Sequence, residues 1–417
     1  MRSKANMVRL SDAQRFDWLR LIRSDNVGPR TFLALVNNLG GARAALEALP
    51  ELARRGGAKR PIRVASPDEI ERELIAARKA GVRFVALGEP EYPPALRQID
   101  SAPPIIALRG REEVLQQPAI AIVGSRNASA AGAAFADRLA RGLGAAGYVV
   151  VSGLARGIDQ CAHAASLETG TIGVLAGGHA RPYPPEAVAL LPRIAEFGAV
   201  LSEMPIEWEP RGRDFPRRNR LVSGLTLGTV VVEAARGSGS LITARFAAEQ
   251  NREVFAAPGS PLDPRAEGTN DLLRDGANIC ARVEDVLSVI DPVRARDPFA
   301  DFREDPGRSD PEEGEPLWGE QPLLGVDPLK IPRASPGAEL DEARGPDFDL
   351  GEDATLRRIE SLLGPSPISV DDLARFADVD VRRARMAIVE LDLAGRIEHS
   401  GGDRVALLPP GGESDPS

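Results

Sequence analysis

Short apolar runs alternate with longer amphipathic stretches through the middle of the chain. The runs are AIAIVG (119–124), YVVVSG (148–153), TIGVLAG (171–177), AVLSEM (199–204), TVVVEA (229–234) and EVFAAPG (253–259). Helical patterns near 130–146 and 157–169 separate the first three. Strands covered on both faces read as near-continuous Val, Ile and Ala runs. The pattern predicts an α/β fold, a doubly wound Rossmann-like domain over residues 103–290.

Both flanks of this domain show a different, helical pattern. Residues 1–100 contain helical spacing around the turn NVGPR (26–30), which predicts a small helical domain. A Gly-Pro turn can present backbone amides to phosphate, as helix-hairpin-helix modules do, but any small bundle also needs such turns. Residues 354–408 read as three helices followed by two strands around Gly401-Gly402. That order predicts a winged-helix domain at the C-terminal end.

The third helix of the predicted winged helix carries a group of arginines. Arg382, Arg383 and Arg385 stand in its first turns, while Glu390 and Asp392 follow further along. The mixed charge leaves two roles open, DNA binding and protein docking.

The acidic character of the chain is concentrated in one segment. The formal net charge is −9. Residues 291–353 hold 18 Asp and Glu against 7 Lys and Arg, a net of −11, so the remainder carries −9 + 11 = +2. The same segment has ten prolines and almost no apolar periodicity. It predicts a disordered linker, and the folded parts remain compatible with an anionic partner.

Cysteine content and hydropathy indicate the cellular compartment in which the protein is expected. Cys161 and Cys280 form no CxxC pair, and the three histidines of the chain complete no zinc site, so we expect neither disulfides nor a metal. The N-terminus lacks a signal-like apolar run, and no stretch approaches the roughly 20 apolar residues that span a bilayer. We therefore expect a cytoplasmic protein without a membrane segment.

Two loops that follow predicted strands carry small residues beside an arginine. In GSRNAS (124–129), backbone amides of Gly124 and Ser125 at a helix start suit an anion, and Arg126 adds a forked donor. The loop is not GxGxxG, and no acidic residue ends the second strand, so we expect no dinucleotide and no other cofactor. In SGLARGID (152–159), Ser152, Gly153 and Arg156 reach the same edge of the sheet.

Two neighbouring residues of the second loop have structural interpretations. Asp159 is expected to cap a helix or to orient Arg156, and His163 is expected to be a packed histidine.

A dense arginine segment precedes the strand at 229–234. Five arginines and one acid lie within residues 211–220, with one aromatic side chain, Phe215, among them; the arginines are Arg211, Arg213, Arg217, Arg218 and Arg220. Such a segment indicates a track that neutralises phosphates and stacks a base. On this hypothesis Arg218 lies on the rim of the sheet, and Arg218→Glu weakens binding without unfolding the protein.

The motifs GSRNAS, SGLARGID, FPRRNRLVSGL and GSGSLITARFAAEQNREVFAAPGSP occur in this order over residues 118–280. In this respect the chain resembles the DNA-processing protein A (DprA, also called Smf) family. The resemblance implies a cytoplasmic protein that binds single-stranded DNA, protects incoming DNA during natural transformation and loads RecA recombinase on it. It also implies a homodimer formed through the Rossmann-like domain and no catalytic residue.

The resemblance also implies a set of DNA-binding residues. Matched motif by motif, these are Gly124, Ser125, Arg126, Ser152, Gly153, Phe215, Arg218, Asn219 and Arg220. To them the charge pattern adds Arg156, Arg211, Arg213 and Arg217. One position departs from the family: a lysine often stands three residues before the phenylalanine, and Gly212 occupies that place here, flanked by Arg211 and Arg213.

Two rival hypotheses remain. One is an enzyme similar to nucleotide phosphoribohydrolases of related fold, with Glu233 of GTVVVE (228–233) as the acid and Arg236 nearby on the rim. That resemblance is faint, because the doubled glycine of those enzymes is absent ahead of Gly228. The other is an interaction scaffold that works through the linker and the winged helix. It predicts that removing 291–417 abolishes function.

Overall fold

The computed structural model describes residues 9–296, 352–400 and 403–408. These residues fall into two compact units. The first, here called the sheet unit, comprises residues 9 and 68–296, and the second, the terminal unit, comprises residues 10–67 with 352–400 and 403–408. The predicted linker lies mostly outside the described residues: of its 291–353 range, 291–295 continue a helix and 352–353 begin another.

The sheet unit is built on nine strands in the order β1-β2-β6-β5-β4-β3-β7-β8-β9. All pairs from β6 to β9 are parallel, whereas β1 and β2 join as antiparallel strands at one edge. The strands are β1 (Arg83–Ala86), β2 (Ile105–Gly110), β3 (Ala119–Gly124), β4 (Val149–Ser152), β5 (Thr171–Val174), β6 (Ala199–Ser202), β7 (Gly228–Val232), β8 (Glu253–Ala256) and β9 (Asn278–Ile279).

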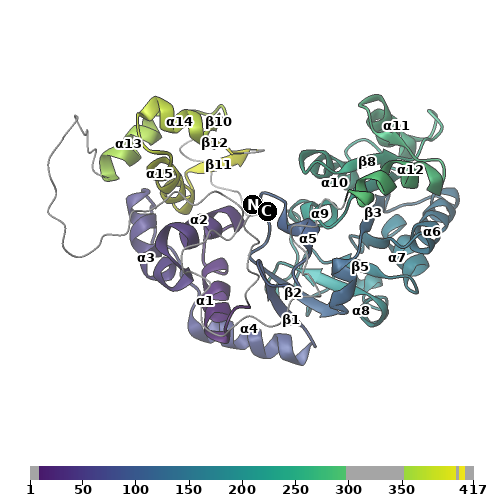
Figure 1. Cartoon of the computed structure of the whole chain (residues 1–417), viewed down its shortest axis with the longest axis horizontal. Coiled ribbons are helices and arrows are strands. Elements are labelled where there is room, and N and C mark those ends of the chain that lie inside the picture. The colour runs from purple at the N-terminus through teal and green to yellow at the C-terminus, as the bar shows by residue number, and fades with distance from the viewer. Residues whose placement is uncertain (1–8, 297–351, 401–402, 409–417) are drawn as a thin grey trace. The chain divides into compact units, whose positions relative to one another are not determined.

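Helices flank this sheet (Figure 1). On one face, Ile120 and Ile122 of β3 share an apolar cluster with Leu139 and Ile290, so α6 (Ala130–Ala145), α7 (Ile158–Ser166) and α12 (Val283–Ala295) cover it. Two others, α9 (Asp214–Gly224) and α10 (Gly239–Glu249), pack together, and α10 contacts β7 and β8. The remaining helices are α4 (Pro67–Lys79), α5 (Pro94–Arg97), α8 (Leu191–Phe197) and α11 (Glu267–Arg274).

The sheet extends further toward the N-terminus than the sequence pattern predicts. Residues 83–86 form β1, although they lie within residues 1–100, which were predicted to be a helical domain. The four-residue run RFVA is too short to be recognised as a strand by itself. Its antiparallel pairing with β2 in a register that opposes Arg83 to Leu108 brings it into the sheet.

The terminal unit contains the predicted helical and winged-helix segments. The helical part consists of α1 (Asp12–Ile22), α2 (Pro29–Leu39) and α3 (Ala42–Arg55) around Trp18, Phe32 and Leu35. The winged helix has α13 (Glu352–Leu362), α14 (Val370–Ala377) and α15 (Val381–Leu393), with the strands β10 (Ile368–Ser369), β11 (Ile397–Ser400) and β12 (Arg404–Leu407). The predicted helical and winged-helix domains are thus confirmed, and β10 adds a third strand.

Within the terminal unit, α15 packs on α2 and α3. The Arg55 guanidinium lies 3.1 Å from the carboxylate of Glu390, which is buried. The Asn26 amide donates to the carbonyl of Leu393 at 2.8 Å, and the Thr31 hydroxyl donates to Asp392. The second half of the third winged-helix helix therefore contacts the helical segment of the same chain, while Arg382, Arg383 and Arg385 at its start are exposed.

Candidate nucleic-acid interface

The candidate site lies where the parallel strands of the sheet unit end. Parallel strands point the same way, so the loops that follow β3, β4, β5, β6 and β7 emerge at one edge. The chain order reverses at β3, which lies between β4 and β7. This edge is the usual location of ligands in open α/β sheets.

The first loop brings a glycine and an exposed arginine to this edge. A Cβ on Gly124 would lie 1.9 Å from the carbonyl oxygen of Val232, so close strand packing requires glycine there. The Ser125 hydroxyl accepts a hydrogen bond from the amide of Asn127 at 3.1 Å. Arg126 is exposed, and its guanidinium carbon lies 5.7 Å from the ring centroid of Phe215. The loop therefore offers Arg126 to solvent beside an aromatic ring.

A carboxylate of the protein already occupies the N-terminus of α6. Glu233, at the end of β7, accepts hydrogen bonds from the Ser129 amide at 2.9 Å and from the Ser129 hydroxyl at 2.5 Å. The Ser129 hydroxyl in turn accepts from the amide of Gly132. The expectation that this helix start is free for an external anion is therefore wrong, because Glu233 supplies the negative charge that a helix N-terminus favours.

The second loop is mostly internal. Ser152 is fully buried and donates its hydroxyl to the carbonyl of Ile122 at 2.6 Å. A Cβ on Gly153 would lie 2.6 Å from a guanidinium nitrogen of Arg218, so Gly153 makes room for that side chain. Arg156 is exposed on 61% of its side chain and lies 3.9 Å from Glu186. Of the three predicted residues in this loop, only Arg156 faces solvent.

The buried groups beside this loop have structural roles. Asp159 accepts hydrogen bonds from the amides of Gly153 and Ala155, at 3.1 and 3.2 Å, in the loop before α7. Among the described residues it therefore binds loop amides and has no hydrogen bond or ion pair with Arg156, and the cap position of α7 is Gly157. His163 is buried against the hydroxyl of Thr171 at 2.7 Å, and burial lowers its pKa to about 3, so it is a neutral packed residue as predicted.

Arg218 lies inside the protein and not on the rim. Only 7% of it is exposed. Its guanidinium donates to the carbonyl oxygens of Gly153 and, at 2.6 Å, of Val174, at the ends of β4 and β5. Burial lowers the pKa of Arg218 to about 10, while the nearby Asp159 carboxylate opposes that shift. Arg218 thus stays charged at neutral pH and holds two strands together.

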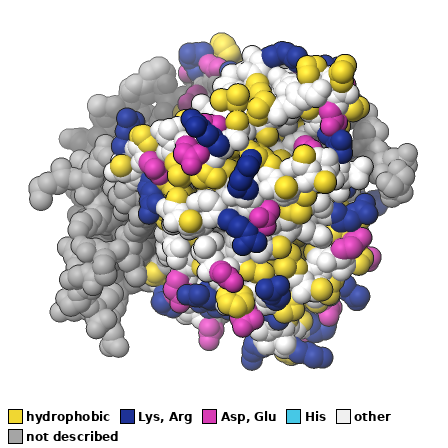
Figure 2. Space-filling view, turned by 90° about the vertical axis from the view of Figure 1, so that its right-hand side faces the viewer, with side chains coloured by type: hydrophobic (Ala, Val, Ile, Leu, Met, Phe, Trp, Pro, Cys, Tyr) yellow, Lys and Arg dark blue, Asp and Glu magenta, His cyan; other side chains and the backbone are white. Residues whose placement is uncertain are grey.

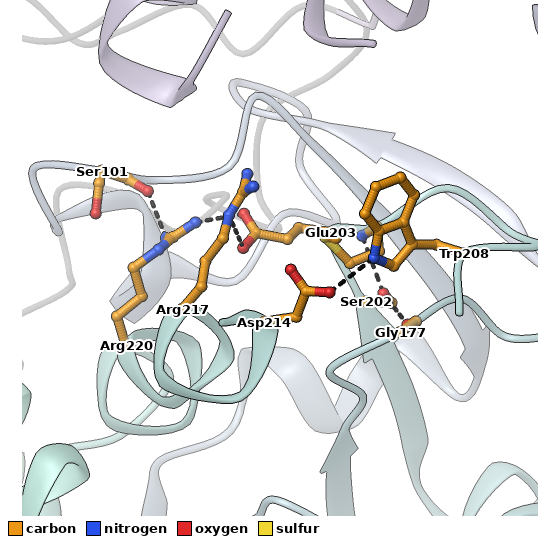
Figure 3. A network of polar contacts seen from close by, with 9 residues as sticks. Ser101, Gly177, Ser202, Glu203, Trp208, Asp214, Arg217 and Arg220 are labelled. Carbon is orange, nitrogen blue, oxygen red and sulfur yellow. Dashed lines mark hydrogen bonds and ion pairs between the residues drawn. The ribbon is translucent and has the colours of Figure 1, made fainter. Parts of the chain in front are cut away.

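Arg220 is also internal, and one carboxylate links it to Arg217. Glu203, which follows β6 and is 7% exposed, pairs with both guanidinium groups: its separation from Arg217 is 3.0 Å (Figure 3). Arg220 donates in addition to the carbonyl of Ser101 at 2.5 Å. Asn219 is buried too and donates to the carbonyl of Gly239 at 3.1 Å. The motif FPRRNR therefore contributes more to the fold than its charge suggests.

Arg218 and Arg220 are buried, in contrast to the prediction, because the segment that carries them is helical. α9 begins at Asp214, and it leaves Arg217 exposed while it buries Arg218 and Arg220. Of the five arginines predicted to form the track, Arg218 and Arg220 are therefore not available to bind phosphate. The predicted arginines that remain exposed at the edge of the sheet are Arg126, Arg156, Arg211, Arg213 and Arg217.

Two aromatic residues near this edge are missing from the sequence-based prediction. Tyr183, in the loop after β5, is 49% exposed, and its ring centroid lies 5.5 Å from that of Phe215 in an edge-to-face arrangement. Trp208, in the loop after β6, is partly exposed, and the Arg211 guanidinium carbon lies 5.0 Å from the centroid of its ring. Aromatic residues make up 4% of the sequence. Because aromatic residues are rare in this sequence, their position close to the arginine segment could have identified them as candidates.

One further face of the sheet unit has mixed charge. The face that carries α6, α11 and α12 shows basic and acidic side chains interspersed (Figure 2). Among the described residues, no group of three or more His, Cys, Asp or Glu side chains is placed to hold a metal ion. None of the helices in the described ranges has the length and apolar character needed to cross a membrane.

Comparisons with known proteins agree with this architecture. Family models match for DNA recombination-mediator protein A over residues 83–291, for the DprA-like N-terminal HHH domain over 12–76 and for the DprA winged helix domain over 336–403. The last range begins outside the described residues.

Individual relatives cover much of the chain. The DNA processing protein DprA of Bacillus subtilis is 40% identical over 236 residues, which are 55% of this chain and 80% of that protein. The protein Smf of Synechocystis sp. is 31% identical over 329 residues, 77% and 79% of the two chains. The X-ray structure of DprA from Streptococcus pneumoniae superposes with a TM-score of 0.56 at 30% identity, covering 67% of this chain and 98% of that one. Together with the fold, these matches show that the chain belongs to the DprA/Smf family of DNA-processing proteins.

Proposed function

We propose that this protein binds single-stranded DNA at the carboxyl edge of its sheet. The observation that carries the proposal is an exposed arginine beside an aromatic pair: Arg126 lies over Phe215, which contacts Tyr183. Guanidinium groups suit the phosphates of a strand, and exposed rings suit its unstacked bases.

The same residue types define how the strand is held. Exposed arginines neutralise phosphates whatever the sequence, and stacking on Phe215 and Tyr183 accepts any base because every base has a π-face. Binding therefore tolerates all sequences and weakens as salt rises. The internal residues Arg218 and Arg220 act indirectly, since they fix the strands and the helix that carry the exposed groups.

Affinity measurements on matched arginine variants test this proposal. Arg138 lies over Phe135 on the flank of α6, at 5.5 Å, and reproduces the Arg126–Phe215 pair away from the edge. We expect Arg126→Ala to weaken oligo-dT binding, measured by fluorescence anisotropy, about tenfold or more. Arg138→Ala loses the same charge and should bind as the wild type does. Equal losses in both variants would contradict a site at this edge.

Family membership supports two further parts of the proposal. We propose that the protein protects incoming DNA during natural transformation or recombination and loads RecA recombinase on it, and that it works as a homodimer through the sheet unit. Two sites in a dimer slow the release of a strand that reaches both.

We further propose that the protein is not an enzyme of the phosphoribohydrolase kind. The hydrogen bonds of Glu233 to Ser129 support this, because they use the carboxylate that such chemistry needs as the cap of α6. Release of free base from a nucleoside monophosphate, lost in Glu233→Gln, would overturn it.

A further inference from the structure

Trp208 and Arg211 form an ordered pair outside the motif FPRRNR of residues 215–220. The indole nitrogen of Trp208 donates to a carboxylate oxygen of Asp214 at 2.8 Å, and the Arg211 amide donates to the same oxygen at 2.8 Å. Asp214 is buried, so both contacts are shielded from water. Figure 3 shows Trp208 turned toward Asp214 at the start of α9. One carboxylate thus fixes the backbone of Arg211 and the ring of Trp208.

The loop that carries this pair is tied to the loop that carries Tyr183. The Gly178 amide donates to the Trp208 carbonyl, and the Ala180 amide to the Ile206 carbonyl, each at 2.9 Å. Neither Trp208 nor Tyr183 is fully buried, and Phe215 follows Asp214 directly in α9. Three aromatic side chains are therefore held on connected backbone at one edge of the sheet.

An indole ring in this position is more than a packing residue. Its hydrogen bond fixes the ring by its edge, while the Arg211 guanidinium lies over its face at 5.0 Å. Arg211 itself is exposed, and within the part of the chain that the structure describes it contacts the Trp208 ring and forms no ion pair. A cation beside a partly exposed indole matches the chemistry of one nucleotide, with a charge for the phosphate and a π-surface for the base.

We propose that Trp208 and Arg211 form a second nucleotide-binding position, adjacent to the one at Arg126 and Phe215. Arg211 contacts a phosphate, and the neighbouring base packs on Trp208. Asp214 is a positioning residue that holds both. This inference rests on the proposed function and extends the path of the strand from α9 onto the loop after β6.

Tryptophan fluorescence tests the position directly. The wild type contains Trp18, which is buried in the terminal unit, Trp208, and Trp318, which lies outside the described residues. We expect oligo-dT to quench wild-type emission and to leave the emission of Trp208→Phe nearly unchanged, although that variant still binds. Quenching of Trp208→Phe equal to that of the wild type would overturn the proposal.

Affinity gives a second readout. We expect Trp208→Ala to weaken binding of a long oligo-dT about tenfold. If Trp208→Ala fails to fold, Trp208→Phe and Arg211→Ala carry the test. A Cβ on Gly212 meets nothing within 4 Å, so Gly212→Lys fits and should restore affinity to Arg211→Ala. Rescue is a result that a merely structural Arg211 would not give.

The outcome separates this inference from the function on which it rests. Absence of oligo-dT binding by the wild type would contradict the proposed function. If Arg126→Ala weakens binding while the Trp208 and Arg211 variants bind as the wild type does, the proposed function holds. Only the second nucleotide-binding position would then be contradicted.

Discussion

At the scale of single residues, the arginines of this protein divide into two groups that the sequence does not distinguish. Arg218 and Arg220 are 7% exposed each and bind carbonyls or a carboxylate of the protein. Arg126 and Arg213 are exposed. A buried guanidinium stabilises the sheet, whereas an exposed one is free to meet a phosphate. Arginine substitutions will therefore affect different properties according to burial.

Arg218 gives the sharpest prediction at this scale. We expect Arg218→Ala to lower the free energy of unfolding by about 3 kcal/mol or more, because it leaves buried carbonyls of β4 and β5 without their donor and removes the charge that faces Asp159. This prediction replaces the earlier one that Arg218→Glu weakens binding without unfolding the protein. Urea denaturation of Arg218→Ala beside the exposed Arg213→Ala measures the difference. Equal midpoints for the two variants would refute the structural role.

At the scale of elements, the apolar runs predicted the parallel strands well. The run 119–124 coincides with β3, and the others overlap β4 to β8. A buried parallel strand can be recognised from its own run of apolar residues. Strands β1, β2 and β9 escaped prediction. β1 depends on its pairing with β2, more than 20 residues away, and β9 is a two-residue strand.

The orientation of α9 was also beyond the sequence. Its segment DFPRRNR has three arginines and only one aromatic residue, so no apolar stripe marks an inner face. Burial of Arg220 depends on Glu203, which comes from a different element, after β6. Long-range polar partners of this kind decide which members of a charged segment form the candidate site.

The contact between α15 and α3 supports a prediction at the scale of elements. A Cβ on Gly56 would lie 1.9 Å from the carbonyl oxygen of Glu390. We expect Gly56→Ala to push the winged helix from the helical segment and to cost the terminal unit about 1–3 kcal/mol. Thermal unfolding and limited proteolysis would report the change. Gly364→Ala is the control, because nothing lies within 4 Å of a Cβ at that position, and matching behaviour of the two variants would contradict the predicted docking.

At the scale of the whole molecule, the net charge of −9 does not preclude exposed arginines at the edge of the sheet, such as Arg126, Arg211 and Arg213. The segment 291–353 carries −11, so a DNA-binding surface is compatible with an acidic chain. In our account, the sheet unit holds the strand through a few exposed arginines and rings, and the buried polar network keeps them in place.

The salt dependence of oligo-dT binding tests this account most directly. Fluorescence anisotropy across a salt series would compare the wild type with the Arg126→Ala, Arg213→Ala double variant. We predict that the logarithm of the wild-type affinity falls linearly with the logarithm of salt concentration, and that the slope decreases by about 0.7 for each phosphate contact removed. No binding by the wild type at low salt, or an unchanged slope in the double variant, would contradict the claim that these arginines hold the DNA backbone.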